Sequence, residues 1–380
     1  MPDAREHDVV VFGATGFTGG LTAEYLAAHG GGARWAIAGR SADKLRRVAD
    51  GLGVDVPVIT ADVSDPKSMR AMAASAKCVL TTVGPYIEWG EPLVAACAAE
   101  GTAYCDLTGE PEFADLMYVR HHAEASRTGA RILHACGFDS IPHDMGVHFT
   151  VQQLPEGVPI AIEGFVRAGG SASGGTVASA LGIMARVRQG QKVLKERRAM
   201  EPHSARRVRG LVKPPRRDKD EGWLLPMPTI DPQVVRQSGL ALERYGPDFS
   251  YAAFIVAPNA AIAAGMGVGA GALFGAAQVP PLRRLISSKI PQGTGPSAER
   301  IAKGWFKLRF RGTGGGQSVV TEVRGGDPGY GDTAKMLAET GLCLALDDLP
   351  QTSGSTTTAA ACGDALRVRL IAAGQQFEVL

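Results

Sequence analysis

Residues 9–19 of the chain read Val9-Val10-Val11-Phe12-Gly13-Ala14-Thr15-Gly16-Phe17-Thr18-Gly19. The valine-rich run predicts a strand, and the pattern that follows it as far as His29 predicts a helix. Gly13 permits a tight turn between them, and Gly16 lets the backbone approach a diphosphate that the helix N-terminus attracts. This context favours a dinucleotide-binding βαβ unit over a glycine turn without a ligand. The contacts are expected from Gly13, Thr15, Gly16, Phe17, Thr18 and Gly19.

The residues after the second apolar run indicate which dinucleotide is bound. Gly39 is followed by Arg40 and Ser41, and Lys44 comes one helical turn later. An NAD site normally has Asp or Glu here to bind the ribose 2′-hydroxyl. Unless Arg40 is simply a solvated surface residue, this basic group suits a 2′-phosphate and predicts NADP(H). The adenine is expected beside two residues that follow the third apolar run, Asp62 and Val63.

Length and composition limit the class of protein. A chain of 380 residues with 45% hydrophobic content predicts two domains and a sizeable core. A formal net charge of +2 argues against nucleic-acid binding. The six cysteines have no metal-binding spacing, so we expect reduced core residues in a cytoplasmic protein. The charged start of the chain lacks the apolar segment of a signal peptide.

The chain predicts an α/β protein with two domains. Residues 1–146 alternate between strand-like and helix-like segments, which favours a Rossmann-type, doubly wound parallel sheet. Residues 147–350 predict a second, α+β domain with a mostly antiparallel sheet, including a hairpin of Trp305–Arg311 and Gln317–Arg324. Residues 351–380 predict a C-terminal helix that packs back on the first domain. The helices expected in the first domain are Phe17–His29, Ala42–Leu52, Pro66–Ala76, Glu91–Glu100 and Glu112–Thr128.

Two stretches of the second domain stand out by composition. Residues 186–219 are rich in Arg and Lys and predict a long basic loop. This loop is either a solvated connection or a landing surface for an anionic carrier protein, a phosphorylated carrier arm or anionic lipid. Residues 249–282 carry no charge, and Gly267, Gly271 and Gly275 recur in them at four-residue spacing. They predict a packed internal or dimer-interface helix, a helix on a membrane surface, or a membrane span.

Two segments are expected to reach the nicotinamide, which lies beyond the carboxyl ends of the central strands in this fold. The first is Thr81–Tyr86 at the end of the fourth strand, which includes Val83, Gly84, Pro85 and Tyr86. The second follows the sixth strand. Tyr86 and His143 are the candidate proton donors by type, whereas Asp139 or Ser140 either caps the next helix or serves the site. No tyrosine is followed by Lys four residues later, so the usual short-chain dehydrogenase pair is missing, and we expect no metal site.

Several motifs together resemble the saccharopine dehydrogenase-like oxidoreductases, and most closely the actinobacterial trans-acting enoyl reductases. The resemblance is carried by Gly13–Gly19, Ala38–Ser41, Thr81–Tyr86, Asp106–Glu110, Ala135–Pro142 and Ser173–Thr176. It runs nearly end to end and is most specific in the first third of the chain. Thr357-Thr358-Ala359 departs from the Thr-Pro-Ala that this family often has before its last helix.

The resemblance implies that an enzyme acting in trans reduces an enoyl thioester on a polyketide synthase carrier, with NADPH, in complex-lipid synthesis. Hydride is expected at the β-carbon, hydrogen-bond donors at the thioester oxygen and an acid at the α-carbon. The candidate donors are Tyr86, Ser140 and Thr176, and the candidate acid is His143.

Two other functions stay open at this point. One is a saccharopine-type reductase of an amino-acid imine, which would need several converging arginines. The other is a non-catalytic NADP(H)-binding protein attached to a membrane, which residues 249–282 suggest. The expected location is the cytoplasm, with a peripheral position at the inner face of the plasma membrane and a homodimer as further expectations.

Overall fold

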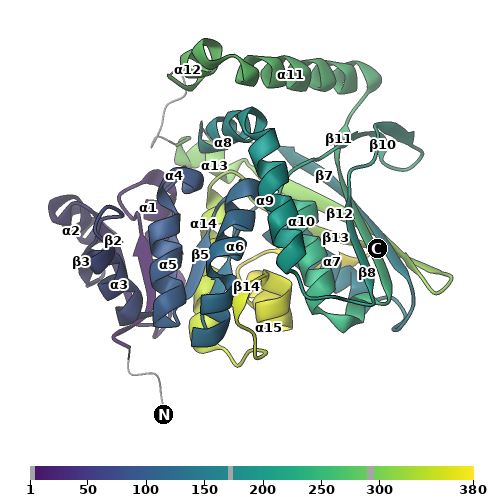
Figure 1. Cartoon of the computed structure of the whole chain (residues 1–380). Helices are drawn as coiled ribbons and strands as arrows, with labels where there is room; N and C mark the ends of the chain where they lie inside the picture. The colour runs from purple at the N-terminus through teal and green to yellow at the C-terminus, as the bar shows by residue number, and fades with distance from the viewer. Residues whose placement is uncertain (1–4, 170–173, 289–294) are drawn as a thin grey trace.

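The computed structural model of the chain describes residues 5–169, 174–288 and 295–380. These residues form two β-sheets with helices packed against them, and the two sheets occupy opposite halves of the molecule (Figure 1). We call the sheet that holds the N-terminal strands sheet A and the other sheet B. The predicted α/β fold with a second, α+β part is confirmed.

Sheet A has seven parallel strands in the order β14-β6-β5-β4-β1-β2-β3. Strand β1 (His7–Phe12) lies between β4 and β2. The others are β2 (Trp35–Gly39), β3 (Val58–Thr60), β4 (Ala76–Thr81), β5 (Ala103–Asp106), β6 (Arg131–Leu133) and β14 (Gly354–Thr356). The order reverses between β1 and β4, and ligands of such sheets bind at this switch point, beyond the carboxyl ends of the strands. The sequence pattern did not predict the seventh strand, β14.

Helices cover both faces of sheet A. Val9 and Val11 of β1 enter the core on one face, and Val10 and Phe12 enter the core on the other. This two-sided burial explains why the strand is an unbroken apolar run. The first face carries α1 (Phe17–His29), α2 (Ala42–Leu52) and α14 (Gly331–Leu346). The second face carries α3 (Pro66–Ser75), α5 (Glu91–Glu100) and α6 (Pro111–Thr128).

Sheet B is mostly antiparallel, in the order β15-β13-β12-β7-β11-β10-β9, with β8 paired to β11. The expected hairpin is present, and it turns at Gly315 and Gly316, whose φ angles of 58° and 77° suit a type I′ turn. The strands are β7 (Ile160–Gly169), β8 (Arg207–Leu211), β9 (Arg216–Asp218), β10 (Gly222–Pro226), β11 (Asp248–Ala257), β12 (Trp305–Gly314), β13 (Gln317–Gly325) and β15 (Gln376–Val379).

One core joins the two sheets. Helices α7 (Ile141–Gln152) and α10 (Asp231–Ala241) cover the inner face of sheet B, and α7 packs as one unit on β12 and β13. The boundary predicted at residue 146 therefore falls inside this helix. The C-terminal helix α15 (Thr358–Ala372) packs on both α14 and α7, and β15 then joins sheet B. The C-terminal part of the chain thus fastens the two sheets together.

The basic segment 186–219 is not the loop that its composition predicts. It contains α9 (Val187–Met200), β8 and β9, and α9 follows α8 (Gly174–Ala185) and packs along α6. Arg197 is buried and donates to Asp115 of α6 (2.6 Å) and to Gln237 of α10 (3.0 Å). The prediction was wrong because a charged side chain that looks solvated in the sequence is paired inside the fold.

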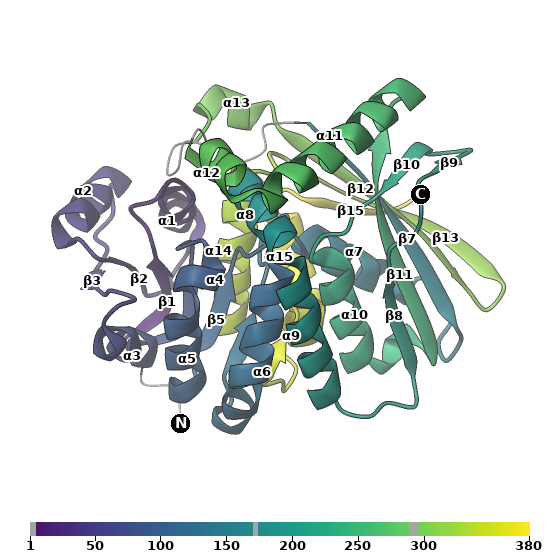
Figure 2. The ribbon, with the colours of Figure 1, turned by 45° about the horizontal axis from the view of Figure 1, so that its top comes forward.

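The uncharged stretch divides into a core strand and an external helix. β11 lies inside sheet B, whereas α11 (Ala260–Gln278) runs over the outside of the molecule, and α12 (Pro280–Ser288) continues from it (Figures 1 and 2). Ala263 and Ala277 are the buried residues of α11. The expectation of a packed internal helix is therefore wrong. By length and composition α11 is able to cross a membrane. A short helix, α13 (Ala298–Ala302), precedes β12.

We predict that Asp115→Ala lowers the free energy of unfolding by about 3 kcal/mol, because the buried Arg197 would be left with the neutral Gln237 side chain (3.0 Å) and the more distant carboxylate of Glu201 (3.5 Å). Denaturant unfolding followed by circular dichroism measures the change. The control is Asp43→Ala, which removes an exposed pair with Arg46 and is expected to cost less than about 1 kcal/mol. Equal losses in the two variants would contradict the structural role of the buried pair.

Candidate functional site

The glycine loop between β1 and α1 has the close contacts that its spacing predicts. Gly13 has a φ of 94°, in the left-handed region that favours glycine. A Cβ on Gly19 would lie 2.2 Å from the Gly13 carbonyl oxygen, so the helix approaches the turn only because no side chain intervenes. Thr82, just after β4, donates a hydrogen bond to the same oxygen (3.3 Å).

The N-terminus of α1 is arranged to receive an anion. Gly16 is its N-cap, Thr15 and Gly16 are exposed, and no side chain of the described residues caps the helix. The N–H groups of residues 17–19 are therefore available to a diphosphate, and the helix dipole favours the same charge. Phe17 packs edge-on against Tyr330, at the start of α14, with ring centroids 5.0 Å apart. The loop thus fits the diphosphate of a dinucleotide.

The end of β2 presents positive charge where an NAD site has an acid. Arg40 and Lys44 are both exposed. Ser41 caps α2 by accepting a hydrogen bond from the Lys44 N–H (3.4 Å), so its hydroxyl already has a structural task. Asp62 accepts bonds from the N–H and hydroxyl of Ser64, and these bonds, with the nearby Arg40 charge, lower its pKa. The arrangement fits the 2′-phosphate of NADP(H).

Tyr86 does not face the expected cleft. Its hydroxyl donates to the Thr81 carbonyl (3.0 Å) and accepts from the Leu107 N–H (3.2 Å), and burial raises the pKa of the phenol well above 10. Its backbone N–H donates to the Glu110 carboxylate (3.0 Å). The geometry does not support Tyr86 as a donor to substrate; it ties the ends of β4 and β5 together instead. The residues that lead from β4 to Tyr86, at the start of α4 (Tyr86–Trp89), are Val83, Gly84 and Pro85.

The buried carboxylate of Asp106 organises the ends of β5 and β6. One oxygen accepts from the N–H groups of Thr108 (3.0 Å) and Ala135 (2.9 Å). The other accepts from the Tyr104 hydroxyl (2.9 Å) and lies 2.7 Å from His134 Nδ1. His134 Nε2 has no partner among the described residues, and the ring borders a cavity of about 10 Å³, room for one water. Asp106 therefore sets the course of the two loops that follow these strands.

Asp139 lies where the chain leaves β6, close to the loop after β5. Burial, with the charges of Asp231 and Asp106, raises its pKa to about 7. A Cβ on Gly109 would lie 3.4 Å from its carboxylate, which places it against the β5–α6 loop. The residue is half-buried and keeps some accessible surface. Such a carboxyl holds a proton near neutral pH and is able to deliver it.

Ser140, the next residue, is buried at the N-terminus of α7. Its hydroxyl oxygen has no hydrogen-bond partner among the residues that the structure describes. The side chain does not cap α7 either. The alternative in which Ser140 only caps the helix is therefore not what the structure shows. A buried hydroxyl without a partner is costly, which favours a partner supplied by a bound molecule or water.

His143 is fully buried between α7 and sheet B. Its Nδ1 lies 2.6 Å from the Tyr251 hydroxyl, and its Nε2 lies 3.5 Å from the carboxylate of Asp231 at the start of α10. Burial lowers the pKa of the imidazole to about 3, so the ring is neutral at neutral pH. Burial also raises the pKa of Asp231 to about 7. The geometry therefore does not support His143 as the acid, because α7 turns the ring away from solvent into the core.

The remaining candidate, Thr176, lies in α8, and its side chain is outside the described residues. Just beyond this helix, Arg186 contacts Glu112 (2.8 Å) and Glu110 (3.4 Å), so the end of α8 is held against the β5–α6 loop. The sequence did not single out Asp231, His134 or Arg186 as residues of the site. Their roles depend on contacts between distant segments, and Asp231, which Pro232 follows, looks only like a helix start.

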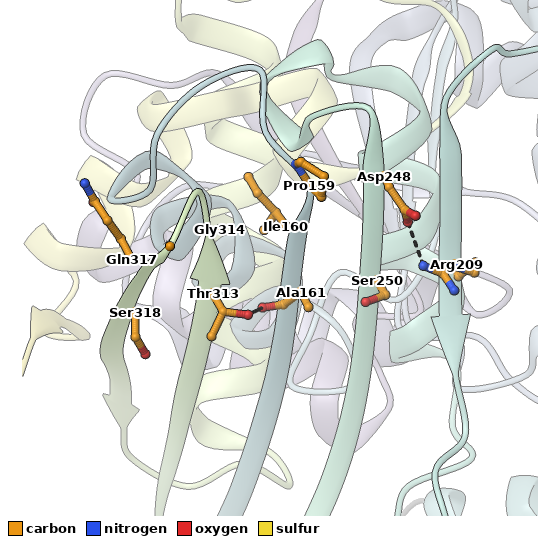
Figure 3. A pocket seen from close by; sticks show the side chains of 11 residues that line it. Pro159, Ile160, Ala161, Arg209, Asp248, Ser250, Thr313, Gly314, Gln317 and Ser318 are labelled. Atoms are coloured by element: carbon orange, nitrogen blue, oxygen red, sulfur yellow. Dashed lines mark hydrogen bonds and ion pairs between the residues drawn. The ribbon is translucent and has the colours of Figure 1, made fainter.

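An open depression of about 560 Å³ lies elsewhere, on sheet B (Figure 3). It is lined by the first residues of β7 and β11, and the Arg209–Asp248 ion pair (2.6 Å) lies at its side. Strand β7 begins here and runs away toward α8, so the depression is at the opposite end of the strand from the Asp139 site. It therefore plays no part in the nucleotide site.

Comparison with known proteins agrees with this site. Residues 9–133 match the saccharopine dehydrogenase NADP-binding domain. A Mycobacterium tuberculosis protein, provisionally named a trans-acting enoyl reductase, is 41% identical over 98% of this chain and 97% of its own. Trans-acting enoyl reductases of Mycobacterium bovis and Mycobacterium leprae are 39% and 38% identical over the same shares. Apo histidine-tagged saccharopine dehydrogenase (L-Glu forming) of Saccharomyces cerevisiae shares the fold, with a TM-score of 0.54, 98% and 99% coverage and 12% identity.

A nucleotide cradle of this kind, within a matching domain, defines an NADP-dependent oxidoreductase of the saccharopine dehydrogenase-like class. The cofactor is NADP(H), as the basic group after β2 predicts. Within that class the full-length similarity is decisive, and the chain belongs to the trans-acting enoyl reductase family.

We predict that Arg40→Ala weakens NADPH binding by about 10- to 100-fold, because one charge-assisted contact to the 2′-phosphate is lost. Titration calorimetry with NADPH and NADH measures the effect, and NADH binding should not change. Arg46→Ala is the matched control, since this exposed arginine of α2 already pairs with Asp43 (2.9 Å). A parallel loss of NADH affinity in Arg40→Ala would contradict 2′-phosphate recognition.

Proposed function

We propose that the protein uses NADPH to reduce the Cα=Cβ bond of an enoyl thioester that a synthase presents in trans, in the formation of polyketide-derived lipids. The names of the mycobacterial relatives support this reaction. The observation on this chain that carries the proposal is the position of the Asp139 carboxyl, which lies against the β5–α6 loop at the carboxyl edge of sheet A and whose pKa is raised by burial to about 7. A nicotinamide binds at this edge in doubly wound sheets.

Bound NADPH would supply the hydride, to the β-carbon of the enoyl group. The protein must then stabilise negative charge on the thioester oxygen and protonate the α-carbon. We assign the oxygen to Ser140, whose buried hydroxyl lacks a partner among the described residues. We assign the proton to Asp139 in place of His143. The balance is one NADPH and one proton consumed for each saturated thioester, and Asp139 regains its proton from water.

The saccharopine-type alternative is less well supported. An imine substrate with several carboxylates needs converging arginines with free donors. Arg186, beside the β5–α6 loop, already pairs with Glu110 and Glu112. A thioester with a neutral acyl chain makes no such demand.

We propose that the carrier domain of the synthase docks on α9. This helix begins directly after Arg186, the residue that pairs with Glu110 and Glu112. An exposed face of α9 has cations at three- and four-residue spacing. They are Arg188, Lys192, Lys195 and Arg198. Glu196 is an exposed acid beside them, and the ammonium group of Lys192 lies 3.9 Å from its carboxylate. A positive surface close to the site attracts an acidic carrier domain and its phosphorylated arm.

We place the reaction in the cytoplasm. The six cysteines are buried and free, which suits a reducing compartment.

Purified protein is expected to oxidise NADPH in step with the conversion of an enoyl thioester to its saturated product, in equal amounts. NADPH fluorescence and mass spectrometry of the acyl group measure the two sides of the balance. An acidic carrier domain bearing the thioester should have a lower KM than the same acyl group on a small thiol. Lys195→Glu should raise the KM for the carrier-bound substrate alone, because it reverses one charge of the α9 face.

The matched control for this charge reversal is Lys67→Glu, an exposed lysine on α3. It should leave both substrates unchanged. NADPH oxidation with lysine and 2-oxoglutarate, together with no turnover of any enoyl thioester in the assay, would establish the imine reaction instead. Tight NADPH binding without turnover of either kind would favour a non-catalytic binding protein.

We predict that Asp139→Asn lowers kcat by about 100- to 10,000-fold, because an amide cannot deliver the proton. The wild-type rate should fall as the pH rises through about 7, since the raised pKa means that Asp139 loses its proton there. The variant should lack this decline and bind NADPH normally. Asp55→Asn, at an exposed carboxylate before β3, is the control and should keep the wild-type profile. An Asp139→Asn enzyme with unchanged rate and pH profile would remove Asp139 from the mechanism.

A further inference from the structure

Helix α11 has no task in the nucleotide cradle or in the proposed reaction, yet it displays large apolar side chains. It runs over the outside of the molecule in both views (Figures 1 and 2). Ala263 and Ala277, near its two ends, are its buried residues. Between them the helix stands away from the body, and its exposed large apolar residues include Ile262, Val268 and Phe274. A soluble protein has no reason to keep such a surface in water.

The apolar side chains point in all directions around the helix axis. With about 100° of rotation per residue, Phe274 and Val268 are turned by about 120° and 240° from Ile262. Their exposed fractions are 44% for Ile262, 74% for Val268 and 47% for Phe274. A single flat partner would cover one of these directions and leave the others in water. An apolar medium that surrounds the helix covers all three, and a helix that is hydrophobic all round normally has such surroundings.

The glycines of α11 support the same conclusion. A Cβ added at any of five positions would meet nothing within 4 Å, so no close packing inside this chain requires the glycines. These positions are Gly265, Gly267, Gly269, Gly271 and Gly275. Glycine destabilises a helix in water, whereas it is frequent in helices within membranes, where backbone groups must bond to each other. Lipid would therefore stabilise this helix more than water does.

The attachment of α11 shows how it would lie in a bilayer. Its N-terminus follows β11 directly and is capped by the Asn259 side chain, which accepts from the Ile262 N–H (2.9 Å). Near its C-terminus, Gln278 donates to the Met184 carbonyl of α8 (2.7 Å). Both ends are thus fastened to the same body. A membrane span would place the ends on opposite sides of the bilayer, so this structure favours a helix that lies in the plane of the interface.

The charge around α11 indicates the kind of lipid. Residues 249–298 contain no Asp or Glu, and their cations are Arg283, Arg284 and Lys289. Arg283 lies in α12, directly after the apolar helix, and Leu282 beside it is 41% exposed. Cations next to an inserted apolar segment contact the phosphates of anionic lipids. No acid in this stretch would oppose the negative potential of such a surface.

We infer that α11 and the start of α12 insert into the interfacial layer of an anionic bilayer and hold the protein on the membrane surface. The observations that carry this inference are the exposure of α11 in three directions, its attachment at both ends, and the acid-free, basic flank. The inference does not depend on the proposed reaction, because binding to lipid is measured without substrate. Because α11 is hydrogen-bonded to α8, a membrane-bound α11 would also hold the Asp139 site at the membrane surface.

Flotation of the full-length protein with lipid vesicles tests the inference. Vesicles of phosphatidylcholine with phosphatidylglycerol should carry the wild-type protein upward, and vesicles of phosphatidylcholine alone should carry much less. The double variant Val268→Glu and Phe274→Glu should reduce the floated fraction by about tenfold or more, because two directions of α11 become charged. Arg283→Gln should lower binding to the anionic vesicles only.

The control is Val368→Glu, which changes an equally exposed apolar residue (62%) on α15, away from α11. It should float like the wild type, and all variants should keep their NADPH affinity and melting temperature. Wild-type protein that stays unbound with both vesicle types would overturn the inference. So would a stable dimer, detected by light scattering, that the double variant separates into monomers, because α11 would then be an interface between two copies.

Discussion

The buried carboxylate of Asp106 is the interaction on which the site depends. It accepts hydrogen bonds from the loop after β5, through Thr108, and from the loop after β6, through Ala135, while Tyr104 and His134 occupy its other oxygen. Four partners saturate a carboxylate, so its burial is compensated. Because both loops are fixed to one group, the carboxyl edge of sheet A keeps a defined shape without help from a ligand.

The second half of the chain completes this edge rather than forming a separate body. α14 covers sheet A, and the Thr333 hydroxyl, in its first turn, accepts from the Phe138 N–H (3.1 Å). α10 brings Asp231 close enough to Asp139 to raise its pKa further than burial alone. The site therefore combines a rigid nucleotide cradle, made early in the chain, with an acidic floor that exists only when both sheets are assembled. The external helix α11 leaves from β11 of the same assembly.

The sequence predicted the elements whose signals are local. The glycine loop, the helices from Phe17 to Thr128 and the hairpin at Gly315-Gly316 each follow from periodicity or turn chemistry within a few residues, and the structure contains them. The basic segment was misread because Arg197 is neutralised by Asp115, which lies 82 residues earlier. β14 escaped notice because three residues carry too little periodicity to mark a strand. Tyr86 and His143 were chosen by residue type, and burial gives both of them other partners.

By itself, then, the sequence determined the class of cofactor and the family, because a βαβ cradle and its basic 2′-phosphate group are written in contiguous residues. Only the tertiary structure decided which side chains stand free at the site. Burial and the nearby charge of Asp231 raise the pKa of Asp139. Burial also lowers the pKa of His143, so that its ring is neutral, and Tyr251, more than a hundred residues away, is its hydrogen-bond partner. The exposure of α11 is also a tertiary result. Its composition suits a core, and only the packing of the other elements leaves it outside.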